Sequence, residues 1–169
     1  MQKEKFITVM AVLDDDTQEL LQSIQYDLEQ QYGPDTKTKG IPFHITLGSY
    51  AVEETEEIVS RIVTVAKQTK CFGVEFSGLN HFGNVVRYID PKMNEELLQL
   101  HKYFDSDYAN GYPDWVPHVT VYRHSAPMEI ELPQEIVEKT DKLKNAKIVG
   151  IELGEFFPAK YIVRVMFEG

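Results

Sequence analysis

Hydrophobic and polar residues alternate along two short stretches of the chain in the pattern of half-buried strands. Residues 44–47 have the sequence His-Ile-Thr-Leu, and residues 118–121 have the sequence His-Val-Thr-Val. Because successive side chains on a strand point to opposite faces, the histidine and threonine of each stretch should share one face while the aliphatic residues anchor the other. Each stretch is therefore predicted to present an imidazole beside a hydroxyl on a packed strand.

The remaining pattern predicts an α+β fold with mainly antiparallel sheets and helices outside them. Apolar residues recur at helical spacing in four segments, and the first helix should end at Gly33-Pro34. Runs rich in β-formers lie between these segments. We expect helices at about 16–32, 53–68, 91–108 and 133–143, and further strands at about 6–13, 72–79, 82–90, 146–157 and 160–168, with a hairpin near Asn80-His81.

The order of these elements occurs twice, which indicates an internal repeat. The tetrapeptide Glu-Leu-Leu-Gln at 19–22 returns 77 residues later, and the two histidine motifs are 74 residues apart. A duplication that folds as a pseudo-symmetric pair brings equivalent residues together about one axis. We therefore predict one bilobal domain over 1–169, with repeat one at about 6–80, repeat two at about 82–169, and a central cleft that carries both motifs.

Composition narrows the classes of partner. The chain has 169 residues and a net charge of −10, and it has no cluster of five or more Lys and Arg residues. A long nucleic-acid duplex is therefore disfavoured, and a small nucleotide or one RNA end is preferred. The single cysteine, Cys71, excludes an internal disulfide and suits a reducing cytoplasm. We expect a cytoplasmic protein with no signal peptide and no membrane span, and the oligomeric state stays open.

The paired motifs resemble those of the 2H phosphoesterase superfamily, which includes 2′,5′-RNA ligase-like proteins and cyclic nucleotide phosphodiesterases. The segment Pro117-His118-Val119-Thr120-Val121-Tyr122-Arg123 is similar to the bacterial ligase-like form. The resemblance implies a metal-independent enzyme, without a cofactor, that cleaves or forms ribose-linked phosphoester bonds. It assigns catalysis to His44 and His118 and phosphate binding to Thr46, Thr120 and Arg123. Strand parity places Arg123 opposite His118 unless a bulge intervenes.

The chemistry of these side chains fits hydrolysis of a 2′,3′-cyclic phosphate or a 2′,5′-linked nucleotide. One histidine must be neutral to accept a proton and the other protonated to donate one, and the ordinary pKa of histidine, about 6.5, suits both tasks. Which histidine is the base stays open. The threonine hydroxyls can donate hydrogen bonds to phosphate oxygens. Tyr122 shares the face of His118 by parity and is a candidate for stacking on a base.

Two alternatives stay open at this point. The two histidines could be ligands of a metal hydrolase, although no carboxylate at ligand-like spacing accompanies them, and activity that resists chelators would exclude it. The chain could also be a non-catalytic module that binds a nucleotide or an RNA end. Binding without turnover across a panel of cyclic phosphates would favour that interpretation.

Overall fold

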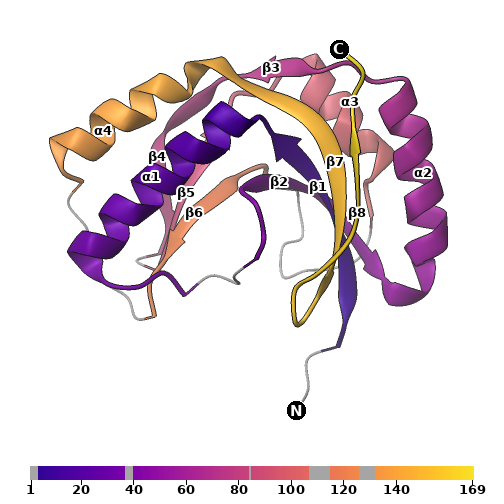
Figure 1. Ribbon diagram of the computed structural model, residues 1–169, viewed down its shortest axis with the longest axis horizontal. Coiled ribbons are helices and arrows are strands. Elements are labelled where there is room, and N and C mark those ends of the chain that lie inside the picture. Colours follow the sequence, from indigo (N-terminus) through magenta and orange to yellow (C-terminus); the bar gives the residue numbers. More distant parts are fainter. Residues whose placement is uncertain (1–3, 37–39, 84, 107–114, 126–131) are drawn as a thin grey trace.

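Two antiparallel sheets flanked by helices form the fold in the computed structural model (Figure 1), which describes residues 4–36, 40–83, 85–106, 115–125 and 132–169. The described strands are β1 (Phe6–Leu13), β2 (His44–Ala51), β3 (Phe72–Val74), β4 (Phe76–Phe82), β5 (Val86–Pro91), β6 (Val119–Arg123), β7 (Ala146–Phe156) and β8 (Lys160–Met166). The α-helices are α1 (Asp15–Tyr32), α2 (Thr55–Lys67), α3 (Glu95–Tyr103) and α4 (Gln134–Thr140), and two 3₁₀-helices are η1 (Val52–Glu54) and η2 (Asp141–Asn145). The predicted α+β class with antiparallel sheets is confirmed.

Each sheet takes strands from both halves of the chain. The first sheet has the order β2-β1-β7, and both β3 and β8 pair with β7. The second sheet has the order β4-β5-β6. Strand β7 comes from the C-terminal half yet pairs with β1, while β4 comes from the N-terminal half yet pairs with β5. In both sheets the strand that carries a histidine motif is therefore an edge strand.

The helices begin and end for local reasons. The side chain of Asp14 caps α1 by accepting a hydrogen bond from the backbone N–H of Thr17. Gly33 ends α1 with a φ of 102°, a left-handed conformation that favours glycine. The side chain of Asn94 caps α3 by accepting a hydrogen bond from the backbone N–H of Leu97. Helix α3 therefore starts at Glu95, four residues later than the predicted start at 91.

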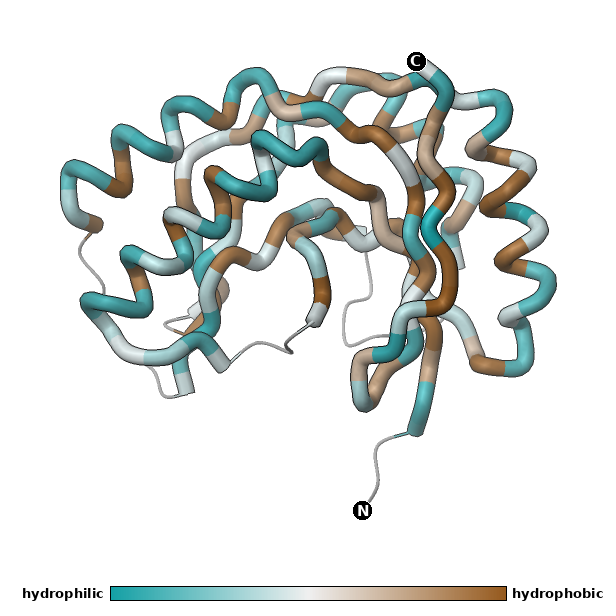
Figure 2. The backbone as a smooth tube through the Cα atoms, in the orientation of Figure 1, coloured by the Kyte–Doolittle hydropathy of each residue, from teal (hydrophilic) through white to brown (hydrophobic). Residues whose placement is uncertain are grey.

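The main hydrophobic core contains residues from both halves of the chain. All eight residues of β1 are buried, because β1 is central in its sheet. Helix α1 contributes a fully buried row at helical spacing, and α2 buries the stripe that its periodicity predicts: Leu21, Ile24, Leu28, Ile58, Ile62, Val65 and Ala66. In Figure 2 hydrophobic and hydrophilic residues alternate along these helices. Among the described helices, none is long and apolar enough to cross a membrane.

The hairpin turn between β4 and β5 lies later than predicted. Strand β4 continues through His81 to Phe82, and the turn follows at Gly83, whose φ is 54°. The sequence pattern around Asn80-His81 is polar, and β4 is exposed on one face, so polarity alone does not mark the end of this strand. Residues 107–114, before Trp115, and residues 126–131 lie outside the described part of the chain.

Candidate functional site

The two motif strands lie next to one another where the sheets meet. Strands β2 and β6 are edge strands of different sheets and contact each other. Their aliphatic residues are fully buried while the histidines and threonines remain partly exposed: Ile45, Leu47, Val119 and Val121 are inside, and His44, Thr46, His118 and Thr120 are at the surface. The buried aliphatic side chains therefore anchor each strand in the core, while its histidine and threonine stay on the accessible face.

Both motif histidines are oriented by equivalent hydrogen bonds. The Nδ1 atom of His44 is 2.8 Å from the carbonyl oxygen of Pro42, and the Nδ1 atom of His118 is 2.7 Å from that of Val116. Each carbonyl lies two residues before its histidine. A carbonyl oxygen can only accept, so Nδ1 donates the hydrogen bond in both rings, and in the neutral ring Nε2 is the nitrogen that carries the lone pair.

In the first motif, the imidazole of His44 is hydrogen-bonded to the hydroxyl of Thr46. The Nε2 atom of His44 is 3.2 Å from Oγ1 of Thr46. A neutral ring accepts a hydrogen bond from this hydroxyl, whereas a protonated ring donates one to it. The hydroxyl of Thr46 is therefore in contact with the nitrogen whose protonation would change during proton transfer.

A β-bulge interrupts each motif strand at the same place. Consecutive residues of β1, Val9 and Met10, pair with Gly48 and Thr46 of β2, so Leu47 is the extra residue of the bulge. The pairing of β5 with β6 goes from Tyr122 to Thr120 and leaves Val121 as the extra residue. These extra residues are the last residues of the two motifs and are 74 positions apart. The bulges reverse the alternation of side chains beyond each motif.

The bulge in β6 corrects the predicted position of Tyr122. Its side chain follows Val121 into the core, where it is fully buried, and its hydroxyl donates a 2.9 Å hydrogen bond to the carbonyl oxygen of Gly33. Burial, reinforced by the carboxylates of Asp35 and Glu29, raises the pKa of Tyr122 above its ordinary value. Tyr122 therefore does not share the accessible face of His118, contrary to the parity prediction.

The same bulge places Arg123 on the exposed side of β6. Its backbone is held by the segment after α1: its N–H donates to Oδ1 of Asp35 at 2.8 Å, and its carbonyl oxygen accepts from the N–H and the hydroxyl of Thr36. Phosphate binding by its guanidinium stays a prediction.

An aromatic pair that the sequence analysis did not identify lies beside His118. The rings of Phe82 and Tyr88 stack with centroids 4.0 Å apart, and each meets the ring of His118 edge to face, at 5.2 Å and 5.7 Å. Tyr88 pairs directly with Thr120, so the two side chains share one face of the sheet. The repeated element order could have indicated this residue, because β5 occupies beside β6 the place that β1 occupies beside β2.

Trp115 links the approach to the second motif with the first motif. Its Nε1 donates a 2.9 Å hydrogen bond to the carbonyl oxygen of Thr46. Its ring lies flat on that of His101, with centroids 3.7 Å apart and an interplanar angle of 3°. The side chain of Trp115 is therefore held by a hydrogen bond at its edge and by ring stacking on its face.

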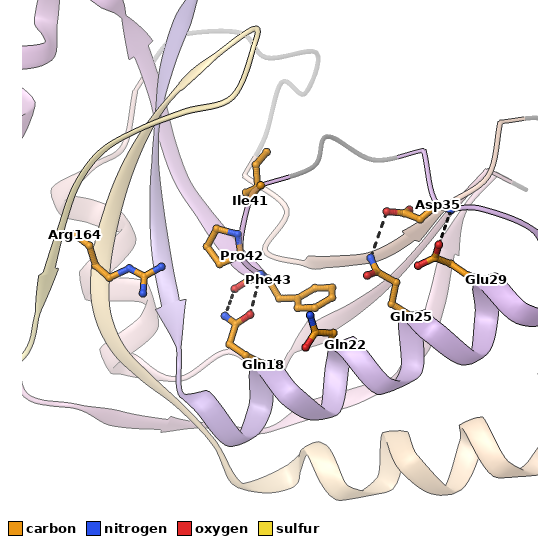
Figure 3. A pocket seen from close by; sticks show the side chains of 10 residues that line it. Gln18, Gln22, Gln25, Glu29, Asp35, Ile41, Pro42, Phe43 and Arg164 are labelled. Carbon is orange, nitrogen blue, oxygen red and sulfur yellow. Dashed lines mark hydrogen bonds between the residues drawn. The ribbon is translucent and has the colours of Figure 1, made fainter.

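A polar cavity of about 560 Å³ adjoins the first motif between α1 and residues 40–43 (Figure 3). The side-chain amide of Gln18 bonds both backbone polar groups of Phe43, donating to its carbonyl oxygen at 2.7 Å and accepting from its N–H at 3.1 Å. Arg164 borders the cavity and is held by the buried carboxylate of Glu152 at 2.7 Å. The residue before His44 is therefore fixed to α1.

Within the described part of the chain, no group of three or more His, Cys, Asp and Glu side chains is arranged to hold a metal ion. His44 and His118 have no carboxylate among their described hydrogen-bond partners. The hydrogen-bond partners that the structure describes for them are backbone carbonyls and a threonine hydroxyl. This donor set suits proton transfer and hydrogen bonding.

Comparison with known proteins identifies both a family model and similar folds. The model described as "2'-5' RNA ligase superfamily" matches residues 13–153. TT0787 of Thermus thermophilus is 17% identical, with a TM-score of 0.67 over 97% of this chain and 98% of that one. LigT of E. coli in its apo form is 13% identical, with a TM-score of 0.61 over 99% and 100% of the two chains. LigT complexed with 3'-AMP is 12% identical, with a TM-score of 0.60 over the same shares. No curated protein sequence matches.

Proposed function

This chain belongs to the 2'-5' RNA ligase superfamily, and we propose that it is a metal-independent phosphoesterase that opens ribose-linked phosphoesters by general acid–base catalysis. The observation that carries this proposal is the matched pair of oriented histidines, His44 at the start of β2 and His118 directly before β6, on two edge strands that contact each other. In each ring the hydrogen bond at Nδ1 orients the imidazole, and we propose that Nε2 of each ring faces the substrate. Two such nitrogens, one from each lobe, are the minimum that a coupled proton donor and acceptor require.

In the proposed reaction His44 and His118 act on opposite sides of one phosphorus atom. With a 2′,3′-cyclic phosphate, one neutral Nε2 removes a proton from water while the water oxygen forms a bond to phosphorus. The bond from phosphorus to one ribose oxygen breaks, and the other Nε2, initially protonated, delivers its proton to that oxygen. The products are a phosphomonoester and a free ribose hydroxyl, and the two histidines have exchanged protonation states.

The threonines supply stabilisation of charge in this proposal. The hydroxyls of Thr46 and Thr120 donate to the non-bridging phosphate oxygens, whose negative charge grows in the transition state. Threonine is β-branched and has few rotamers, so its hydroxyl is oriented before the substrate binds. Arg123, on the exposed side of β6 beyond the bulge, adds a positive charge to the same site.

A small nucleotide is the substrate class that we infer. LigT of E. coli has been crystallised with 3'-AMP, with ATP and with NADP+, which supports nucleotide-sized ligands for this fold. The net charge of −10 argues against a long phosphate backbone as the ligand. The stacked pair of Phe82 and Tyr88, half-exposed beside His118, takes the place of Tyr122 as the proposed platform for a base.

The test is an assay in the presence of a chelator with 2′,3′-cyclic nucleotides, cyclic phosphate RNA ends, ADP-ribose cyclic phosphate and 2′,5′-linked oligonucleotides. Products are identified by phosphorus NMR. We expect turnover of at least one substrate without added metal. Activity that disappears with the chelator and returns with a divalent cation would support a metal hydrolase instead. Binding of these ligands without turnover would support a non-catalytic binding module.

A further inference from the structure

Each bulge carbonyl of the motif strands accepts a hydrogen bond from a helix of the other half of the chain. The side-chain amide of Gln25, on α1, donates to the carbonyl oxygen of Val121 in β6 at 3.0 Å. The Nδ1 atom of His101, on α3, donates to the carbonyl oxygen of Leu47 in β2 at 2.9 Å. Because β2 and β6 are edge strands, no further strand among the described residues bonds these two carbonyls. The two contacts are reciprocal, since each helix bonds the motif strand of the opposite half.

A second pair of contacts repeats this reciprocal pattern just beyond the helices. The hydroxyl of Thr36, after α1, donates to the carbonyl oxygen of Arg123 in β6. The hydroxyl of Ser106, after α3, donates to the carbonyl oxygen of Ser49 in β2. Arg123 and Ser49 each lie two residues beyond the bulge of their strand. Each motif strand is therefore fastened at equivalent points to the opposite half of the molecule.

The His101 contact is itself held in place. Its ring stacks on Trp115, which donates to the carbonyl oxygen of Thr46, the residue adjacent to Leu47. Its Nε2 faces a carboxylate oxygen of Asp105 at 3.7 Å. On the other side of the molecule, the amide of Gln25 also donates to Asp35. Both donors are thus oriented before any substrate binds.

We propose that Gln25 and His101 are the positioning residues of the two motifs, Gln25 for His118 and Thr120 and His101 for His44 and Thr46. This proposal rests on the proposed function, because it assigns these donors to the geometry of that reaction. Each donor fixes the backbone one residue beyond a threonine that binds the phosphate. Displacements of about 1 Å at such positions lower rates by about 100-fold.

The first test compares variants with and without the donor. Gln25→Met and His101→Phe keep side-chain bulk and remove the hydrogen bond, while His101→Gln keeps a donor. Gln22→Met is the matched control, because Gln22 lies one turn earlier on α1 and makes no described hydrogen bond to a motif strand (Figure 3). We expect kcat to fall about 10-fold or more in the two donor-free variants, with KM within about 2-fold of the wild-type value. His101→Gln and Gln22→Met should retain most of the wild-type kcat.

The second test asks whether each residue acts through its own motif. His101→Phe should have a much smaller effect on kcat when Thr46→Val is already present, and its full effect when Thr120→Val is present. Gln25→Met should show the reverse dependence. An equal effect in both backgrounds would overturn the proposal, as would an unchanged kcat in both donor-free variants.

Amide hydrogen exchange separates this proposal from the proposed function. Gln25→Met should lower the protection of β6 amides and His101→Phe that of β2 amides, each leaving the other strand at its wild-type protection. Should the wild-type protein turn over no substrate, the proposed function fails while this readout still tests the positioning. Unchanged protection of both strands would overturn the proposal, and so would a uniform loss of protection in both variants. If His101→Phe does not fold, Gln25→Glu, which is isosteric and lacks the donor, provides the second variant.

Discussion

His44 and His118 make equivalent hydrogen bonds at Nδ1, but different side chains surround their rings. The Nε2 atom of His44 contacts the hydroxyl of Thr46, whereas the ring of His118 is bordered by the edges and faces of Phe82 and Tyr88. A planar aromatic pair beside the second motif fits a planar ligand group. In the proposed site, the nucleobase therefore lies on the side of His118.

Replacing Tyr88 tests this placement of the base. Tyr88→Ala removes the stacking surface, and stacking on an aromatic side chain contributes about 1–3 kcal/mol per base. We expect KM for a small nucleotide substrate to rise about 5- to 150-fold with little loss of kcat. Tyr122→Phe is the comparison, because its ring is buried and should leave KM unchanged. Equal KM values for Tyr88→Ala and wild-type protein would show that the base binds elsewhere.

Two buried tyrosines predict how stability depends on alkaline pH. Desolvation raises the pKa of both Tyr50 and Tyr122 above the ordinary value of 10.0. The unfolded chain then releases these protons at lower pH than the folded chain, so their contribution is complete below pH 10 and is lost as pH rises through the folded pKa values. Urea titrations between pH 8 and 11 should show a falling free energy of unfolding. The decline should be shallower in the Tyr50→Phe, Tyr122→Phe double variant, and an unchanged slope would contradict the assignment.

At the scale of elements, the alternation of residues predicts the motif strands but not their bulges. The pattern of buried Ile45 and Leu47 was visible in the sequence, and so was the helical row of α1. An extra residue in a strand has no sequence signal, because Val121 is as good a strand former as its neighbours. That one residue decides that Tyr122 lies inside and that Arg123 lies outside.

The close approach of α3 to β2 gives a second element-scale prediction. A Cβ atom added at Gly48 would lie 1.9 Å from the carbonyl oxygen of Phe104, which ends α3. We expect Gly48→Ala to lower the free energy of unfolding by at least about 2 kcal/mol, because a backbone carbonyl has little room to move. Gly78→Ala is the control, since nothing lies within 4 Å of its added Cβ. Denaturant unfolding of both variants measures the difference, and equal stabilities would contradict this close contact between α3 and β2.

In the whole molecule, the repeated element order predicts two lobes but not that β7, from the C-terminal half of the chain, joins the sheet of β1 and β2. The N-terminal half of the chain supplies β4 to the sheet of β5 and β6, and the C-terminal half supplies β7 to the sheet of β1 and β2. The pairing of β4 with β5 is the hairpin that the sequence predicts, whereas β1 and β7 lie near opposite ends of the chain, and pairing partners so distant in sequence leave no local pattern. The exchange matters for the proposed chemistry because it makes β2 and β6 the facing edges of two interlocked sheets.

The overall charge predicts a weak dependence of catalysis on salt. With a net charge of −10, the chain has little capacity to bind phosphates beyond those at the site. We expect a plot of log kcat/KM against log salt concentration to have a slope no steeper than about −1, since each neutralised phosphate of a single strand contributes about −0.7. Lengthening an RNA that ends in a cyclic phosphate should leave this slope nearly constant. A slope that steepens with each added nucleotide would contradict the preference for a small ligand.

The proposed function requires that His44 and His118 act on one phosphate as proton donor and acceptor. It is tested most directly by measuring kcat/KM of the purified His44→Ala and His118→Ala proteins on the best 2′,3′-cyclic phosphate substrate, with a chelator present and folding checked by circular dichroism. We expect each substitution to lower kcat/KM by about 10²- to 10⁴-fold. Turnover at the wild-type rate by either folded variant would contradict it.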